Sequence, residues 1–289
     1  MKANKETLIR WILATVAWSS LLFLGLIMVF LFMEGLPAFK EVGITEFLFG
    51  MHWYPTSEPP EFQIFPLIVG SLAVTAVASC LAIPLGVMTA AWLTEVAPTA
   101  LRRIVKPMIE LLAAFPSVVI GFLGMIILAP ILQDWFDADT GLNLLNAGIM
   151  LAFMSVPTMC SGAEDALFGV PQSLREASLA LGATRWETTA KVVIPAAFSG
   201  IGTACMLGIS RSIGETMVVL MVAGGAGIIP EFIFDPVRPM PAAIAAEIAE
   251  ASFRGEHYHA LFAIGIVLFM LTLAFNIIAQ KISLNKAQV

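Results

Sequence analysis

Two oppositely charged residues, Arg211 and Glu215, stand inside the otherwise apolar stretch 196–222. If this stretch is a helix, Arg211 lies roughly 22 Å along it, near the middle of a bilayer. A charge there costs about 2.5–3.5 kcal/mol, so it calls for a partner or a function. The guanidinium fork suits an oxyanion, and on a continuous helix Glu215 would share its face. Either Arg211 contacts an anion in transit, with Glu215 orienting it or acting as a gate, or the two neutralise each other and pin a helix bundle.

Other residue types that carry chemistry are sparse. Cys80, Cys160 and Cys205 all lie in apolar runs without metal-ligand spacing, and we interpret them as small buried residues. His257 and His259 could bind a metal, but no third ligand stands nearby, so we expect them to face solvent or the membrane interface. The sequence contains no GxxxxGK[ST] motif that could cradle the phosphates of ATP.

The elements that must position these residues are membrane helices. The chain of 289 residues is 59% hydrophobic and 12% charged, against about 45–50% and about 25% in soluble domains. The chain contains runs of about 20 or more mostly apolar residues, enough to cross about 30 Å of hydrocarbon as helices. Helix is the expected structure because it satisfies the backbone N–H and C=O groups within the run itself. Prolines within several runs indicate bent helices. The predicted spans are residues 11–33, 65–93, 108–132, 142–162, 196–222 and 260–281.

The basic residues predict the orientation of these spans. The first run has no charge between Trp11 and Met33, which is too long for a signal-peptide core, so we expect it to be retained. With both termini in the cytoplasm, eleven Lys and Arg residues lie inside and three outside, a clear positive-inside bias. Residues 223–259 then form an extracytoplasmic loop with a short helix near its end. The inside group is Lys2, Lys5, Arg10, Arg102, Arg103, Lys106, Arg175, Arg185, Lys191, Lys281 and Lys286, and the outside group is Lys40, Arg238 and Arg254.

The loop 163–195, on the cytoplasmic side, has the pattern of two short helices. Gly182 suits the residue just past a helix end. Thr184 and Glu187 have the spacing of a capping box, so a second helix should begin there and end near Pro195. We expect a compact elbow.

This elbow resembles the signature of ABC-importer permeases, which reads Glu-Ala-Ala, three residues, Gly, nine residues, Ile, one residue, Leu-Pro. Here Ser178, Val192 and Ile194 depart from the pattern but keep its small or aliphatic character. The resemblance implies that the elbow docks into a groove of a separate ATPase; the other interpretation is an amphipathic loop lying on the membrane. The implied ATPase-coupling residues are Glu176, Ala177, Ser178, Gly182, Ala183 and Pro195.

Three longer segments resemble the phosphate-specific ABC importer: LLAAFPSVVIGFLG (111–124), SLREASLALGATRWETTAKVVIPAA (173–197) and SRSIGETMVVLMVAGG (210–225). The last is closer to PstC-type than to PstA-type permeases. The resemblance implies an all-α polytopic protein with six transmembrane helices, the type I (MetI-like) importer fold, and a single permease domain over 1–289. It implies a multi-pass protein of a prokaryotic inner membrane.

The implied function is translocation of inorganic phosphate without chemistry by this chain. ATP and Mg would be bound by two copies of a PstB-like ATPase, beside a PstA-like second permease and an external PstS-like binding protein, with membrane lipid around them and no nucleic acid. Three alternatives stay open. They are a permease for phosphonate, sulfate or molybdate, an ATPase-independent secondary transporter or channel, and a sensor of phosphate status.

A stripe of small residues lies beside the charged face of the fifth span. It lets another helix approach closely, and we predict a partner helix there, for example one from a second permease. Glu95 and Glu110 are expected at the membrane interface, outside the transport route. The stripe consists of Gly200, Ala204, Gly208 and Ser212.

Overall fold

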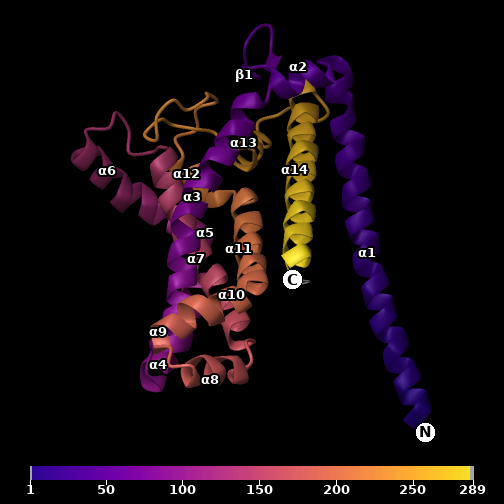
Figure 1. The fold of residues 1–289 in the computed structure, drawn as a ribbon. Coiled ribbons are helices and arrows are strands. Elements are labelled where there is room, and N and C mark those ends of the chain that lie inside the picture. Colours follow the sequence, from indigo (N-terminus) through magenta and orange to yellow (C-terminus); the bar gives the residue numbers. More distant parts are fainter. Residues whose placement is uncertain (1, 287–289) are drawn as a thin grey trace.

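The computed structural model of the chain describes residues 2–286, which fold into helices and one two-stranded hairpin (Figure 1). In the hairpin, Trp53 pairs with Phe62 and Tyr54 with Glu61 in antiparallel register. We call the region around it the hairpin end, and the opposite region, around α8 and α9, the elbow end. The elements are α1 (Lys2–Glu41), α2 (Ile44–Phe49), β1 (Trp53–Tyr54), β2 (Glu61–Phe62), α3 (Phe65–Ala91), η1 (Trp92–Val96), α4 (Thr99–Ala113), α5 (Ser117–Leu123), η2 (Gly124–Leu128), α6 (Ala129–Phe136), α7 (Leu144–Phe168), α8 (Gln172–Ala180), α9 (Arg185–Thr188), η3 (Thr189–Val193), α10 (Ile194–Ala196), α11 (Phe198–Ile213), α12 (Met217–Val222), α13 (Met240–Glu247) and α14 (Glu256–Lys286).

Five helical segments within the described residues are long and apolar enough to cross a membrane. A sixth is obtained when residues 185–196 and 198–213, which are bent by 69° at Ala197, count as one span. On that count the predicted number of six spans is reached, but the sixth segment begins within the elbow at residue 185 and so differs from the predicted span 196–222. The five segments are Ile9–Glu41, Phe65–Val96, Ser117–Phe136, Leu144–Phe168 and Glu256–Lys281.

The third span begins later than predicted. It starts at Ser117 rather than at 108, and the preceding residues form the separate helix α4. Pro116 has no backbone N–H and disfavours a helical conformation at Phe115, so one helix ends before it and another begins after it. Glu110 therefore lies on α4, outside the span.

The fifth span is not the single helix predicted over 196–222. Helix α11 ends at Ile213, and α12 begins again at Met217. Gly214, which has low helix propensity, stands at the start of the break. A break inside a membrane is tolerated where protein or a water-filled cavity covers the backbone.

Helix α7 is the centre of the molecule, packed between α3 and α11 (Figure 1). Small residues permit this close approach: a Cβ on Gly162 would lie 2.7 Å from the Cβ of Ala204, and one on Gly200 would lie 2.5 Å from that of Ala166. Ser212 Oγ lies 2.8 Å from Ser155 Oγ in the same contact. The small-residue stripe of α11 therefore has the predicted partner helix, which is α7 of this chain rather than a helix of a second permease.

Helix α1 is attached to the rest of the molecule mainly through α14. Gly35 makes the closest approach, because a Cβ there would lie 3.0 Å from Ala263 N and from Phe262 C on the α14 backbone. Toward its N-terminus, α1 diverges from α14 (Figure 1). None of its apolar 18-residue window is buried within the chain.

Gly35→Ala should loosen the contact between α1 and α14, since the added methyl group meets backbone that cannot move aside. We expect a loss of about 1–3 kcal/mol, measured as a lower unfolding temperature in detergent. Gly25→Ala is the matched control on the same helix, because its Cβ would have nothing within 4 Å. Equal unfolding temperatures for the two variants would contradict the observed packing.

Candidate functional site

The predicted elbow is present at the end of the molecule that carries α8 and α9. Gly182 adopts a φ of +87° just past α8, a conformation that favours glycine. Thr184 Oγ1 accepts a hydrogen bond from the Glu187 backbone N–H (3.2 Å), and Glu187 Oε2 accepts one from the Thr184 N–H (3.0 Å). Hydrogen bonds from the backbone N–H and then the hydroxyl of Thr184 hold the pKa of Glu187 below its ordinary value. The hydrogen bonds that the Glu187 carboxylate accepts from Thr184 are therefore lost only when the pH falls through that lowered pKa. The predicted capping box is confirmed.

The two elbow helices are fastened together at Ser178. Its hydroxyl is buried and lies 2.9 Å from Thr188 Oγ1. The outer surface of the elbow is different in character. Glu176 and Ala177 are exposed, and Leu181 and Trp186 are 91% and 72% exposed. The elbow thus presents apolar side chains outward on a fixed pair of helices.

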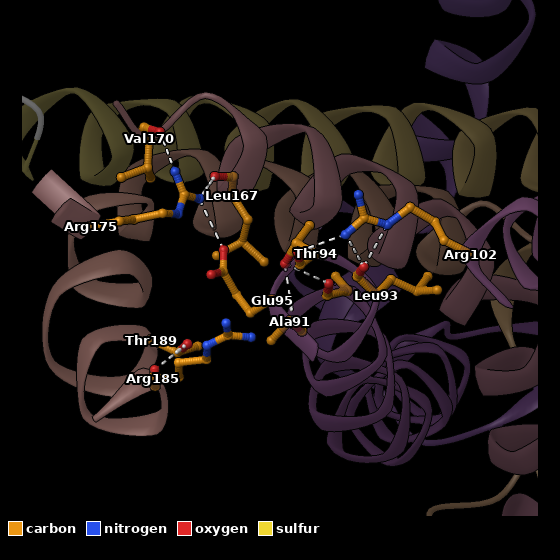
Figure 2. A network of polar contacts seen from close by, with 11 residues as sticks. Ala91, Leu93, Thr94, Glu95, Arg102, Leu167, Val170, Arg175, Arg185 and Thr189 are labelled. Atoms are coloured by element: carbon orange, nitrogen blue, oxygen red, sulfur yellow. Dashed lines mark hydrogen bonds and ion pairs between the residues drawn. The ribbon is translucent and has the colours of Figure 1, made fainter. Parts of the chain in front are cut away.

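Arg175 on α8 ties the elbow to the ends of two spans (Figure 2). Its Nη1 donates to Val170 O (2.6 Å), and its Nη2 donates to Leu167 O and to Glu95 Oε1, both at 2.9 Å. Leu167 O belongs to the last turn of α7 and also accepts from the Val170 N–H (3.3 Å), whereas Val170 O lies just past the end of the helix. Both charged side chains are nearly buried, at 15% and 14% exposure. Glu95, expected merely at the interface, is an anchor point of the elbow.

Arg102 ties α4 to the end of the second span. Its Nε donates to Leu93 O (2.7 Å), and its Nη2 donates to Leu93 O and to Thr94 O (2.6 Å). The guanidinium also lies over the Phe168 ring, 4.9 Å from the centroid. A cation at a helix C-terminus complements the helix dipole. We call Glu95, Arg102 and Arg175 the polar clasp.

A cavity of about 610 Å³ lies between the elbow and the polar clasp. Figure 2 shows Arg175 and Arg185 entering this region from the elbow, opposite Glu95 and Thr94 of η1. The cavity is lined by elbow residues, among them Arg185 and Thr188, and by Thr94 and Glu95 at the end of the second span. Sequence reasoning counted these basic residues as signs of orientation and missed their contacts, because an arginine in a loop gives no sign of which helix end it will cap.

A second ion pair, between a partly exposed lysine and a buried carboxylate, fixes α4 to α7. Lys106 Nζ lies 3.1 Å from Glu164 Oε2, and the Glu164 side chain is 2% exposed. Glu164 Oε1 has no hydrogen-bond partner within the described part of the chain. This carboxylate therefore depends on a single cation.

Arg211 and Glu215 do not share a helix face. Arg211 is in the last turn of α11, whereas Glu215 lies in the break before α12. In the described part of the chain no ion pair joins them; the Arg211 side chain is exposed, and its Nη1 lies 3.4 Å from Thr158 Oγ1 of α7. The expectation of a shared helical face is wrong, because Gly214 interrupts the helix between them. Arg211 is left with an open guanidinium beside a hydroxyl group.

The two histidines are not turned to solvent. His257 Nε2 lies 2.9 Å from Glu247 Oε2, and Arg238 donates to the other carboxylate oxygen at 2.6 Å. His259 Nδ1 lies 2.7 Å from the backbone oxygen of Glu34. These contacts join α13, α14 and the end of α1 at the hairpin end. No group of three or more metal-ligating side chains occurs among the residues that the structure describes.

Residues 82–285 match the family described as "Binding-protein-dependent transport system inner membrane component". The chain is 38% identical over 259 residues to the "Probable ABC transporter permease protein YqgH" of Bacillus subtilis, covering 89% of this chain and 84% of that protein. It is 36% identical over 270 residues to the "Phosphate transport system permease protein PstC" of Pasteurella multocida, covering 87% and 83%. The protein of that name from Haemophilus influenzae is 30% identical, covering 98% of this chain and 94% of that protein.

Solved structures share the architecture. A chain of a bacterial alginate ABC transporter, in complex with an alginate pentasaccharide-bound periplasmic protein, aligns with a TM-score of 0.67 at 17% identity, covering 96% of this chain and 93% of that chain. A chain of the MetNI methionine ABC transporter in an inward-facing conformation aligns with a TM-score of 0.61 at 18% identity, covering 77% and 95%. At these identities the likeness establishes the fold.

Lys106→Met should destabilise the protein, because it leaves Glu164 buried without a counter-ion, at a cost of up to about 3–5 kcal/mol. Replacing both partners, as Lys106→Met with Glu164→Gln, should restore most of the unfolding temperature in detergent. Lys191→Met is the control, since its ion pair with Glu187 is exposed and should contribute little. A double variant no more stable than Lys106→Met alone would argue against this assignment.

Proposed function

The chain belongs to the family of binding-protein-dependent transport system inner membrane components, and we propose that it carries inorganic phosphate as a permease of an ATP-driven importer. Membership makes it a multi-pass, non-catalytic inner-membrane subunit with the MetI-like permease fold. A separate ATPase binds and hydrolyses the nucleotide, and a substrate-binding protein is a further partner.

The observation that carries the choice of phosphate is the agreement between whole-length relatives and the exposed Arg211. Relatives named as phosphate permeases match over most of their own length. Arg211 offers an exposed guanidinium inside a transmembrane segment. A guanidinium matches the geometry of a tetrahedral oxyanion and stays charged at every physiological pH.

Arg211 and Glu215 form the proposed substrate path. Glu215 lies in the break that follows the helix of Arg211, and within the described part of the chain no ion pair joins the two residues. A single arginine is a weak phosphate site, which suits a step where the anion must also leave. Tight capture then belongs to the external binding protein.

The elbow is the proposed docking element for the ATPase. Glu176, Ala177, Gly182 and Ala183 lie on or beside its outward surface, while Ser178 holds the two helices together. A preformed pair of helices loses little conformational entropy on docking. Pro195 marks the passage from the elbow to α11.

The proposed orientation places the elbow and both termini in the cytoplasm. The excess of Lys and Arg in the corresponding segments supports it. The complex would hold a PstA-like second permease, two PstB-like ATPase subunits and an external PstS-like binding protein. The exposed apolar surface of α1 would be covered by lipid or by the second permease.

Proteoliposomes that contain the complete complex should take up labelled phosphate in an ATP-dependent manner. Excess unlabelled phosphate should compete, and equal sulfate, molybdate or phosphonate should not. If one of these anions competed and unlabelled phosphate did not, that anion would be the cargo in place of phosphate. Uptake without ATP would overturn the proposal as a whole.

Arg211→Ala should lower phosphate uptake by about tenfold or more, the loss expected for a hydrogen bond to a charged group. Arg211→Lys should retain part of the uptake, because it keeps the charge but not the planar fork. Arg103→Ala is the matched control, an exposed arginine of α4 outside the path. Assembly of the complex should be unchanged in all three, and undiminished uptake by Arg211→Ala would remove this residue from the path.

A further inference from the structure

We infer that Arg175 is a positioning residue, through which movement of the elbow reaches the ends of the second and fourth spans. The inference rests on the proposed function, because it requires a motor that docks on the elbow. It assigns to the Arg175–Glu95 contact a role in coupling ATP hydrolysis to transport.

The covalent chain alone joins the elbow to only two spans. Residues Val170 and Pro171 lead back to α7, and Ala197 leads on to α11 through a bend of 69°. The second span, α3 with η1, is distant along the chain, since Glu95 and Arg175 are 80 residues apart. The Arg175–Glu95 ion pair therefore connects the elbow directly to the second span, which the backbone does not link to the elbow.

The contact has the properties that a mechanical link needs. The guanidinium is held at once by Val170 O, Leu167 O and Glu95 Oε1, at 2.6 to 2.9 Å, so its orientation is fixed from two sides (Figure 2). Arg175 and Glu95 are 15% and 14% exposed, so water screens the pair weakly. A displacement of α8 cannot leave η1 behind without breaking the charged hydrogen bond from Arg175 Nη2 to Glu95 Oε1.

The link continues beyond η1. Arg102 binds the carbonyl groups of Leu93 and Thr94 and so joins η1 to α4, and Lys106 of α4 binds Glu164 of α7. The elbow, η1, α4 and α7 are thus connected in a closed ring by polar contacts. The exposed Lys191–Glu187 pair, by contrast, has both partners inside the elbow and can transmit nothing to a span.

The test is the number of phosphate ions transported per ATP hydrolysed by the complete complex in proteoliposomes. Arg175→Met and Glu95→Ala should each lower this ratio by about tenfold, with ATP hydrolysis kept within about twofold of wild type. Arg175→Lys should give an intermediate ratio, because an ammonium group keeps the ion pair but cannot bind all three oxygens in one plane. Lys191→Met, the matched control within the elbow, should keep the wild-type ratio.

The double variant Arg175→Met with Glu95→Ala distinguishes a shared link from two independent structural defects. It should be no worse than Arg175→Met alone, because both changes remove the same contact. If Arg175→Met fails to assemble, Glu95→Ala and Arg175→Lys decide the question. An unchanged ratio in the assembled variants overturns the inference and leaves the proposed function intact, whereas a wild-type complex without ATP-driven phosphate uptake overturns the proposed function first.

Discussion

Carbonyl oxygens at the end of a membrane helix need donors, and at the elbow end two arginines supply them. Arg102 binds carbonyl groups in the last turn of the second span, and Arg175 binds Leu167 O in the last turn of the fourth span and Val170 O just past its end. Each arginine belongs to a different segment from the helix that it caps. Satisfying the backbone therefore also decides which segments are tied together, and the elbow, α4 and the spans become one connected layer.

Close packing of α7 supplies the rigidity against which this layer can act. Small residues on α11 bring it within van der Waals contact of α7, and the buried Ser155–Ser212 contact fixes their register. Arg211 stands on that same helix and reaches Thr158 of α7. The proposed cargo path thus lies beside the close contact between α7 and α11, and the break at Gly214 separates α11 from α12.

Two routes consequently lead from the elbow toward Arg211. One follows the chain through Pro195 and the bend at Ala197 into α11. The other passes through Arg175 into α7, whose Thr158 contacts Arg211. The polar clasp makes the second route independent of the sharp bend in the first. A motor acting on the elbow would move α11 and α7, the helices of Arg211 and Thr158, together.

Local patterns in the sequence determined the membrane class, the number of spans, the elbow with its Gly182 turn, and the Thr184–Glu187 capping box. These features depend on composition, periodicity and contacts between residues a few positions apart. Tertiary structure alone decided the rest. It showed that Gly214 separates Arg211 from Glu215, that α7 covers the small-residue stripe, and that Glu95, 80 residues from Arg175, anchors the elbow. A pairing across that distance depends on how whole helices are placed, and no local rule of charge or spacing specifies it.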